Sequence, residues 1–280
     1  SSGGDYYSST IQPIFDAKCS SCHGGSKTDA GLNLTSWKNL VKGSDAGEAI
    51  IAFNSANSVL VEMATKLRPA AHPSSQPSSV LSEAELSTIT TWIDNGAKGP
   101  EGLAPFSGNR EFVYVTNQGE ATINVIDVEE NVVARLVDLK TMGFDAGAKP
   151  HHLAVEENGS FWYATLISAG VILKFNRNNE IVGRAAFEVP GLLSMDPSSD
   201  RLFVGRSMAA VNPPQRIGMI DRRTMEIEEL EVFFPRPHAL AVSSDGKYVY
   251  TASLAENKAV AIDIDNEEAT FKDIEGPIHT

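Results

Sequence analysis

The sequence contains only two cysteines, few basic residues and no long apolar run. No stretch approaches the ~18 consecutive apolar residues of a spanning helix, so no transmembrane segment is expected. Lys and Arg number 23 against 36 Asp and Glu, which gives a net charge of −13 and leaves no basic stripe for nucleic acid. A protein partner is therefore expected to present a basic or neutral contact face. With 42% hydrophobic and 21% charged residues, the composition is that of a globular protein.

Both cysteines lie in one short motif, Cys19-Ser20-Ser21-Cys22-His23. A disulfide, half of a zinc site, a redox-active thiol pair and a c-type haem site all use two cysteines separated by two residues. A closed zinc site lacks its second cysteine pair here, and Ile11–Ala17 lacks the strand character that precedes a thioredoxin-like thiol pair. On a helix the two thiols share a face, so both can bond one haem while His23 reaches its iron. The motif therefore predicts one covalently bound haem c.

Helical patterns lie on both sides of this motif in the first third of the chain. Before it, Thr10 can cap a helix, Pro13 suits a first turn, and Phe15 continues the helical spacing. Further on, Ser82–Glu85 has the form of a capping box, and apolar residues recur at helical spacing until Asn95-Gly96. These patterns predict a first helix that carries the motif and a last helix that ends at the glycine.

The motifs of this segment, taken as a set, resemble the planctomycete-type family of class-I-like cytochrome c domains. The family's features stand here at Ile11–Phe15, Cys22–Gly24, Gly31–Leu34, Leu81–Leu86 and Trp92–Ala97. The resemblance covers about a third of the chain, and it implies a small α-helical domain with covalent haem.

The resemblance also bears on the sixth iron ligand, which this family takes from a Met-Pro-Pro segment before the last helix. This sequence has His72-Pro73 there, so His72 is the predicted ligand. Met63 is the alternative, although its helical spacing from Val59 and Leu60 suits a residue that fills a core. An iron with an open sixth position is the third alternative. Either side-chain ligand would close the iron to substrates and leave electron transfer as its chemistry.

The sequence pattern changes at Asn109. From there on, short alternating runs rich in Val, Ile, Tyr and Thr are separated by turn residues. The segment Pro150–Gly159 returns as Pro237–Gly246. A degenerate copy begins at Pro190 and a further one at Pro277, so the repeat is about 40 to 47 residues long. A repeat of this length with four strands predicts a β-propeller blade.

The complete repeats are each expected to contain four strands, whereas the first contains three and lacks its innermost strand. The expected strands of the first two blades are 111–117, 122–128, 132–139, 151–156, 161–166, 170–175 and 181–188. An incomplete blade would leave an unpaired strand edge, so we expect these blades to belong to a longer propeller or to be completed by another chain. The run Tyr114–Asn117 resembles the YVTN family of propellers, which implies a fold more than an activity.

Four of the six histidines lie where blades open, namely His151, His152, His238 and His279. Innermost strands ring the central channel of a propeller, so these side chains are placed to meet near one mouth of it. They are candidates for a second metal or haem site, as in the cytochrome cd nitrite reductases, which also join a c-type domain to a propeller. The alternative is that histidine at this position caps turns, as in YVTN-type blades.

The sequence thus predicts an α-helical domain followed by an all-β one, with a polar tail at 1–9, a cytochrome c domain at 10–104 and propeller blades at 105–280. The expected function is electron transfer, with the propeller docking a redox partner or a larger membrane-associated complex. An oxidoreductase with a second site in the propeller is the alternative, and no hydrolase elbow, phosphate loop or dinucleotide fingerprint is present. The opening Ser1–Asp5 has neither an initiator methionine nor a signal sequence, so either a targeting segment was removed or the sequence was shortened. A periplasmic or extracellular location is expected for a redox protein of this kind, with a lipid anchor as an open alternative.

Overall fold

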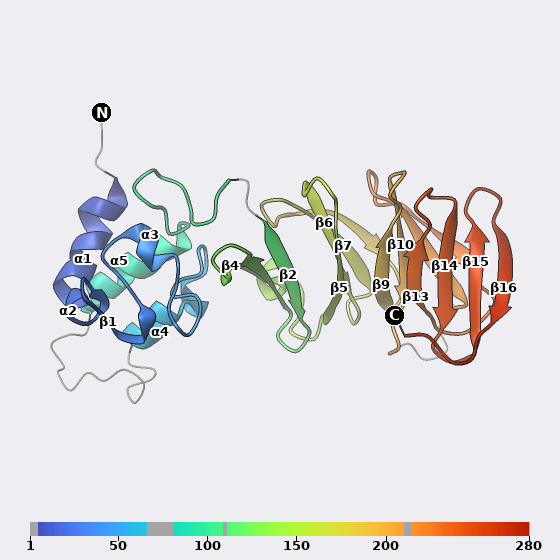
Figure 1. The fold of residues 1–280 in the computed structure, drawn as a ribbon, viewed down its shortest axis with the longest axis horizontal. Coiled ribbons are helices and arrows are strands. Elements are labelled where there is room, and N and C mark those ends of the chain that lie inside the picture. Colours follow the sequence, from blue (N-terminus) through green and yellow to red (C-terminus); the bar gives the residue numbers. More distant parts are fainter. Residues whose placement is uncertain (1–4, 66–80, 109–110, 210–213, 280) are drawn as a thin grey trace. The chain divides into compact units, whose positions relative to one another are not determined.

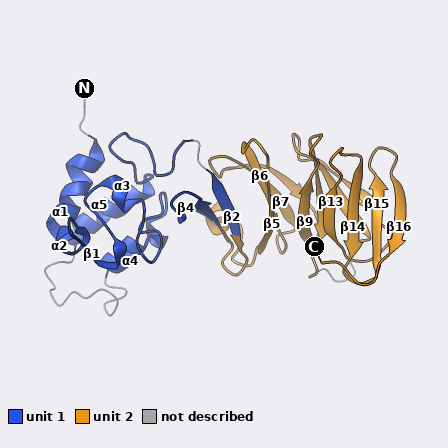
Figure 2. Ribbon diagram, viewed as in Figure 1, with its two compact units in different colours: residues 1–115, 124–137 blue, residues 116–123, 138–280 orange. Residues whose placement is uncertain are grey.

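The structure, a computed structural model, describes residues 5–65, 81–108, 111–209 and 214–279 (Figure 1). The chain forms two compact units, which are residues 1–115 with 124–137 and residues 116–123 with 138–280 (Figure 2). The predicted domains, residues 10–104 and 105–280, are each one continuous segment, whereas each compact unit consists of two segments. The predicted domain limits stay a prediction. No helix within the described ranges is both long and apolar enough to cross a bilayer.

Unit 1 contains a series of short helical segments. They are η1 (Tyr7–Ile11), α1 (Gln12–Lys18), α2 (Ser20–His23), η2 (Asp29–Gly31), α3 (Trp37–Leu40), η3 (Ser55–Asn57), α4 (Val59–Ala64) and α5 (Glu83–Asp94), with the short strand β1 (Lys27–Thr28) after α2. The expected start at Thr10 is wrong, because the helical segment already begins at Tyr7. The Asp5 carboxylate accepts the N–H of Ser8 at 2.6 Å, and Tyr7 packs against Trp92 in the core. Pro13 lies in the first turn of α1, which continues the helical backbone of η1.

Helix α5 has the ends that the sequence predicts. Ser82 and Glu85 form a complete capping box at its start, and Gly96 follows its last turn with a φ of 99°. Its inward face buries Ile89 and Ile93 fully against the first helix and α3. The core of unit 1 is therefore a small helical one, and α5 closes it.

Three four-stranded antiparallel sheets and one three-stranded sheet follow along the chain (Figure 1). The first is β2 (Phe112–Asn117), β3 (Thr122–Asp127) and β4 (Val132–Asp138), and the second is β5 (Pro150–Val155), β6 (Phe161–Leu166), β7 (Val171–Asn176) and β8 (Ile181–Ala186). The third is β9 (Pro190–Met195), β10 (Arg201–Arg206), β11 (Arg216–Asp221) and β12 (Ile227–Glu231), and the fourth is β13 (Pro237–Val242), β14 (Tyr248–Ser253), β15 (Lys258–Asp263) and β16 (Glu268–Asp273). Each strand pairs with its neighbour in sequence, as in propeller blades. The predicted strand counts of four and three are confirmed within the described residues.

The first strands of the complete blades lie next to one another, since β9 contacts both β5 and β13. Each of these strands begins with a proline, and its pairing shifts register directly afterwards. Such β-bulges turn the side chains of the extra residues away from the regular alternation. The bulges therefore determine the side-chain direction of the residues directly after Pro150, Pro190 and Pro237.

The copy of the repeat predicted at Pro277 does not form a strand within residues 277–279. Instead, the N–H of Ile278 donates a hydrogen bond to the carbonyl of Ser253 at 3.3 Å. This contact joins the segment to the end of β14. Buried apolar clusters lie between successive blades, with Tyr163 and Leu202 in one and Phe203 and Val249 in the next.

Candidate functional sites

Cys19, Cys22 and His23 lie on one helical turn, at the break between α1 and α2. Cys19 leaves the helical conformation, with φ −120° and ψ −26°. Its carbonyl accepts the N–H of Cys22 at 3.1 Å and the N–H of His23 at 2.9 Å. The backbone therefore brings all three residues of the motif onto a single turn.

The two thiols are in an environment that suits attachment better than redox chemistry. Neither cysteine is in a disulfide, and both are partly buried. Burial, with the charges of Glu85 and Cys22, raises the pKa of the Cys19 thiol to about 11, although Lys18 opposes the shift. A thiol with this pKa is protonated at neutral pH, and only the thiolate attacks disulfides. The environment of Cys19 thus disfavours a redox-active thiol pair.

Two backbone contacts fix the course of the chain after the motif. The N–H of Leu34 donates to the carbonyl of His23 at 2.7 Å. Gly24 passes so close to α2 that a Cβ on it would lie 2.8 Å from the carbonyl oxygen of Ser20. A larger residue at this position would displace the turn, so Gly24 helps to hold His23 beside the two cysteines.

The residues of unit 1 fit a haem c on the chemistry of their donor groups. Two thiols and an imidazole on one turn are the protein groups that such a haem uses. Apolar side chains of intermediate exposure that pack on the core are available to cover the macrocycle. They are Ile14, Leu32, Trp37, Val41, Leu60, Val61 and Leu81.

The structure leaves the sixth iron ligand as a prediction. His72 lies outside the described residues. Met63 lies on α4, as its spacing predicts, but it is only partly buried and does not belong to the described core cluster. Met63 therefore does not fill the described core, and its side chain remains the alternative to His72 as the sixth iron ligand.

In unit 2 the structure brings three of the four propeller histidines together. The ring centres of His151 and His238 are 6.2 Å apart, and those of His238 and His279 are 5.0 Å apart. His152 has a different role, because its Nδ1 accepts the N–H of Leu193 at 3.1 Å and links two inner strands. His152 still lies near the other rings, since burial and the nearby His151 and His238 lower its pKa, and the second site at the four histidines stays a prediction.

Burial keeps the inner histidines neutral. It lowers the pKa of His151, and the nearby His238 and His279 lower it further. Burial also lowers the pKa of His238, although its hydrogen bond with the carbonyl of Arg206 opposes the shift. A lowered pKa leaves an imidazole uncharged at pH 7, with a lone pair available on one ring nitrogen.

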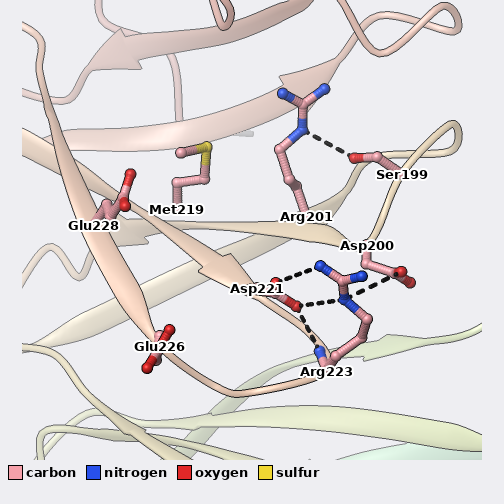
Figure 3. A pocket seen from close by; sticks show the side chains of 8 residues that line it. All are labelled: Ser199, Asp200, Arg201, Met219, Asp221, Arg223, Glu226 and Glu228. Carbon is pink, nitrogen blue, oxygen red and sulfur yellow. Dashed lines mark hydrogen bonds and ion pairs between the residues drawn. The ribbon is translucent and has the colours of Figure 1, made fainter.

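A further hollow lies on the blade formed by β9–β12 (Figure 3). Its lining residues are Ser199, Asp200, Arg201, Met219, Asp221, Arg223, Glu226 and Glu228. Arg223 pairs with Asp221 at 2.8 Å, and Arg201 donates to Ser199 at 2.9 Å (Figure 3). The arginines of this hollow are already engaged by neighbouring acceptors, so we assign it no ligand.

The geometry around Cys19 and His23 agrees with a comparison against protein families. Residues 19–70 match the family Planctomycete cytochrome C. The matched range of this cytochrome c family contains the whole haem motif and Met63, whereas His72 lies just beyond it. A comparison with curated proteins returned no match.

Solved structures similar to this chain contain propeller-like folds. They include virginiamycin B lyase from Staphylococcus aureus (18% identity, TM-score 0.48) and a chain of Kuenenia stuttgartiensis hydrazine synthase (17% identity, TM-score 0.48). The alignments cover 59% and 58% of this chain, and 53% and 46% of those chains. The WD40 repeats of RRP9 match at 11% identity and a TM-score of 0.51, over 60% of this chain and 49% of that one. The chain thus spans about half the length of these structures. The similarity to the WD40 repeats supports the propeller fold alone.

Sequence reasoning missed three residues around the histidine cluster. Gln118 lies with its side-chain amide nitrogen 2.8 Å from Nδ1 of His151, and Arg206 supplies the carbonyl that contacts His238. In the third sheet, β9–β12, Gly191 occupies the position that His151 and His238 occupy in the blades before and after it. Only Gly191 had a sequence signal, since it directly follows the proline that begins its repeat.

Proposed function

We propose that this protein is an electron carrier that binds one haem c through Cys19, Cys22 and His23. The observation that carries the proposal is the single turn that holds all three residues, within a segment that matches a cytochrome c family. Together with the propeller fold, this arrangement supports electron transfer rather than thiol chemistry.

Each residue of the motif has a distinct task in this proposal. The thiols of Cys19 and Cys22 would each add across one vinyl group of the haem. The S–H bond and the vinyl π bond would be broken and one C–S and one C–H bond formed, so no oxidant is needed. His23 would supply a nitrogen ligand for the iron. The bound haem would supply a one-electron iron couple. The half-buried apolar side chains around the motif would exclude water from it, which lowers the solvent reorganisation that accompanies a change of charge.

The propeller is proposed to dock a redox partner or to belong to a larger membrane-associated complex. The net charge of −13 favours a partner with a basic or neutral contact face. We place the protein on the periplasmic or extracellular side of a bacterial membrane, where c-type cytochromes work. Association with such a partner is expected to weaken as ionic strength rises.

Extraction of the haem tests the proposal directly. In acidified acetone the haem should remain with the wild-type protein, and dithionite should give the sharp α band of a reduced c-type haem. The Cys19→Ala/Cys22→Ala variant should retain no covalent haem, whereas Ser20→Ala/Ser21→Ala, in the same turn, should retain it. Release of free haem from wild-type protein, or equal haem content in both variants, would contradict the proposal.

An oxidoreductase with a second centre in the propeller is the second candidate function. The observation that favours it is the convergence of His151, His238 and His279. A substrate-dependent change in the optical spectrum of the reduced protein, under exclusion of oxygen, would support this candidate. Simple reoxidation by an added electron acceptor, with no such change, would support the carrier.

A further inference from the structure

The inner strands of three successive blades place a glycine between two histidines. The residue after the opening proline is His151 on β5, Gly191 on β9 and His238 on β13. All three lie at β-bulges. The rings of His151 and His238 come from the strands on either side of β9, and their centres lie 6.2 Å apart.

His238 is oriented in the way that metal-binding histidines usually are. Its side chain is fully buried, and Nδ1 lies 2.7 Å from the carbonyl oxygen of Arg206. A carbonyl only accepts hydrogen bonds, so Nδ1 must carry the proton and Nε2 must carry the lone pair. A backbone carbonyl bonded to the far nitrogen of a ligand histidine is the usual support of a metal site.

The nitrogens that would bind the ligand lack partners of their own. Nε2 of His238 and Nε2 of His151 are both buried, and neither makes a hydrogen bond within the described structure. Nδ1 of His151 faces the side-chain amide of Gln118 at 2.8 Å, so this amide must turn its oxygen toward Nδ1 for Nε2 of His151 to carry the lone pair. A buried polar atom left without a partner costs free energy, and such atoms are uncommon in folded proteins. A ligand shared by the two rings would remove this cost for both.

The ring separations fit a shared metal ion. Two imidazoles on one tetrahedral zinc, with Zn–N bonds of about 2.0 Å, have ring centres about 5 Å apart, and the limit for a linear arrangement is about 6 Å. The 5.0 Å between the ring centres of His238 and His279 corresponds to the tetrahedral arrangement. The 6.2 Å between those of His151 and His238 lies at the limit for a linear arrangement. As described, the side chains do not form a three-ligand group. Binding of one ion by all three therefore requires rotation of side chains, and His279 is exposed and free of tight packing at this end of the chain.

We propose that His151, His238 and His279 bind one divalent transition-metal ion at the inner end of the propeller blades. Neutral imidazole nitrogens suit Zn²⁺, Cu²⁺ or Ni²⁺, whereas Ca²⁺ and Mg²⁺ take oxygen ligands. The site lies in unit 2 and does not depend on haem.

Zinc titration of the haem-loaded protein tests this site. Haem attachment occupies both thiols, so zinc cannot use them. After treatment with a chelator, calorimetric titration with ZnCl₂ at pH 7.5 should show one ion per chain, and MgCl₂ should show none. The haem spectrum should stay unchanged, which excludes zinc binding at the iron ligands and keeps this test separate from the test of the proposed function.

Histidine variants identify the ligands. His279→Ala should weaken zinc binding at least tenfold, and because this side chain is exposed, the fold should be retained. His151→Ala should act in the same direction. His152→Ala is the matched control, since its Nδ1 is engaged by Leu193, and it should bind zinc as the wild type does. The absence of a stoichiometric site in wild-type protein, unchanged affinity in His279→Ala and His151→Ala, or an equal loss in His152→Ala would overturn the proposal.

Discussion

Ser82 and Glu85 bond each other reciprocally at the start of α5. The N–H of Glu85 donates to the hydroxyl oxygen of Ser82 at 3.3 Å, and the N–H of Ser82 donates to the carboxylate of Glu85 at 2.8 Å. These two bonds satisfy donors that would otherwise lack partners at a helix start. The helix that they begin carries Trp92, which packs on Tyr7. A contact between residues three apart thus supports the packing of the whole helical core.

Removal of this cap should destabilise the helical unit. We expect Ser82→Ala to lower the free energy of unfolding by about 1 kcal/mol, because the N–H of Glu85 loses its acceptor. Denaturant unfolding of the haem protein, followed by helical circular dichroism, measures the loss. Ser87→Ala is the control, because this exposed residue lies inside α5 and alanine is the better helix former there. Equal losses in the two variants would show that the capping box has no special role.

The sixth iron ligand can be identified from variants of the two candidates. With His72 as the ligand, the oxidised protein should lack the weak near-infrared-edge band of methionine ligation. His72→Ala should open the reduced iron to carbon monoxide, while Met63→Leu should leave the spectrum unchanged. The reverse pattern would assign the ligand role to Met63. Binding of carbon monoxide to the wild-type protein would indicate an open sixth position.

Close packing of the inner strands should make Gly191 sensitive to substitution. A Cβ at this position would lie 2.8 Å from the carbonyl carbon of Arg206. We therefore expect Gly191→Ala to lower the melting temperature, at a cost of about 1–3 kcal/mol for overpacking. Gly119→Ala is the control, since a Cβ there meets nothing within 4 Å. A melting temperature equal to that of the control would contradict the close approach of β9 and β10.

Asp196 should make the propeller unit sensitive to acid. Burial alone would raise the pKa of Asp196, but hydrogen bonds from Ser199, Ser198 and Arg201 outweigh burial and lower the pKa to about 2. Because the folded-state value is below the ordinary one, the carboxylate adds stability above about pH 4 that is lost as the pH falls toward 2.

The matching measurement is the midpoint of denaturant unfolding at several pH values. Asp196→Asn should reduce stability at pH 7 by up to about 2 kcal/mol and should flatten the pH dependence between 4 and 2. Asp273→Asn, on the exposed end of β16, should leave both unchanged. An unaltered acid dependence in Asp196→Asn would mean that other carboxylates control it.

Several features followed from the sequence because they depend on neighbours along the chain. The turn that holds Cys19, Cys22 and His23 needs only hydrogen bonds between residues three and four apart. The capping box at Ser82 and the strands of each blade are equally local, since turn residues and alternation set them. Hydrogen bonds between residues this close in sequence can be predicted from the order of the residues alone.

Tertiary contacts decided the rest. The first helix begins at Tyr7 because that ring packs on Trp92, which lies far along the chain. His151 and His152 are adjacent residues of the same type, yet one joins His238 and the other bonds Leu193. No local pattern separates these two, because the partners that distinguish them, His238 and Leu193, lie on strands of other blades. Only the stacking of blades brings them together, and it determines which histidine meets its partners.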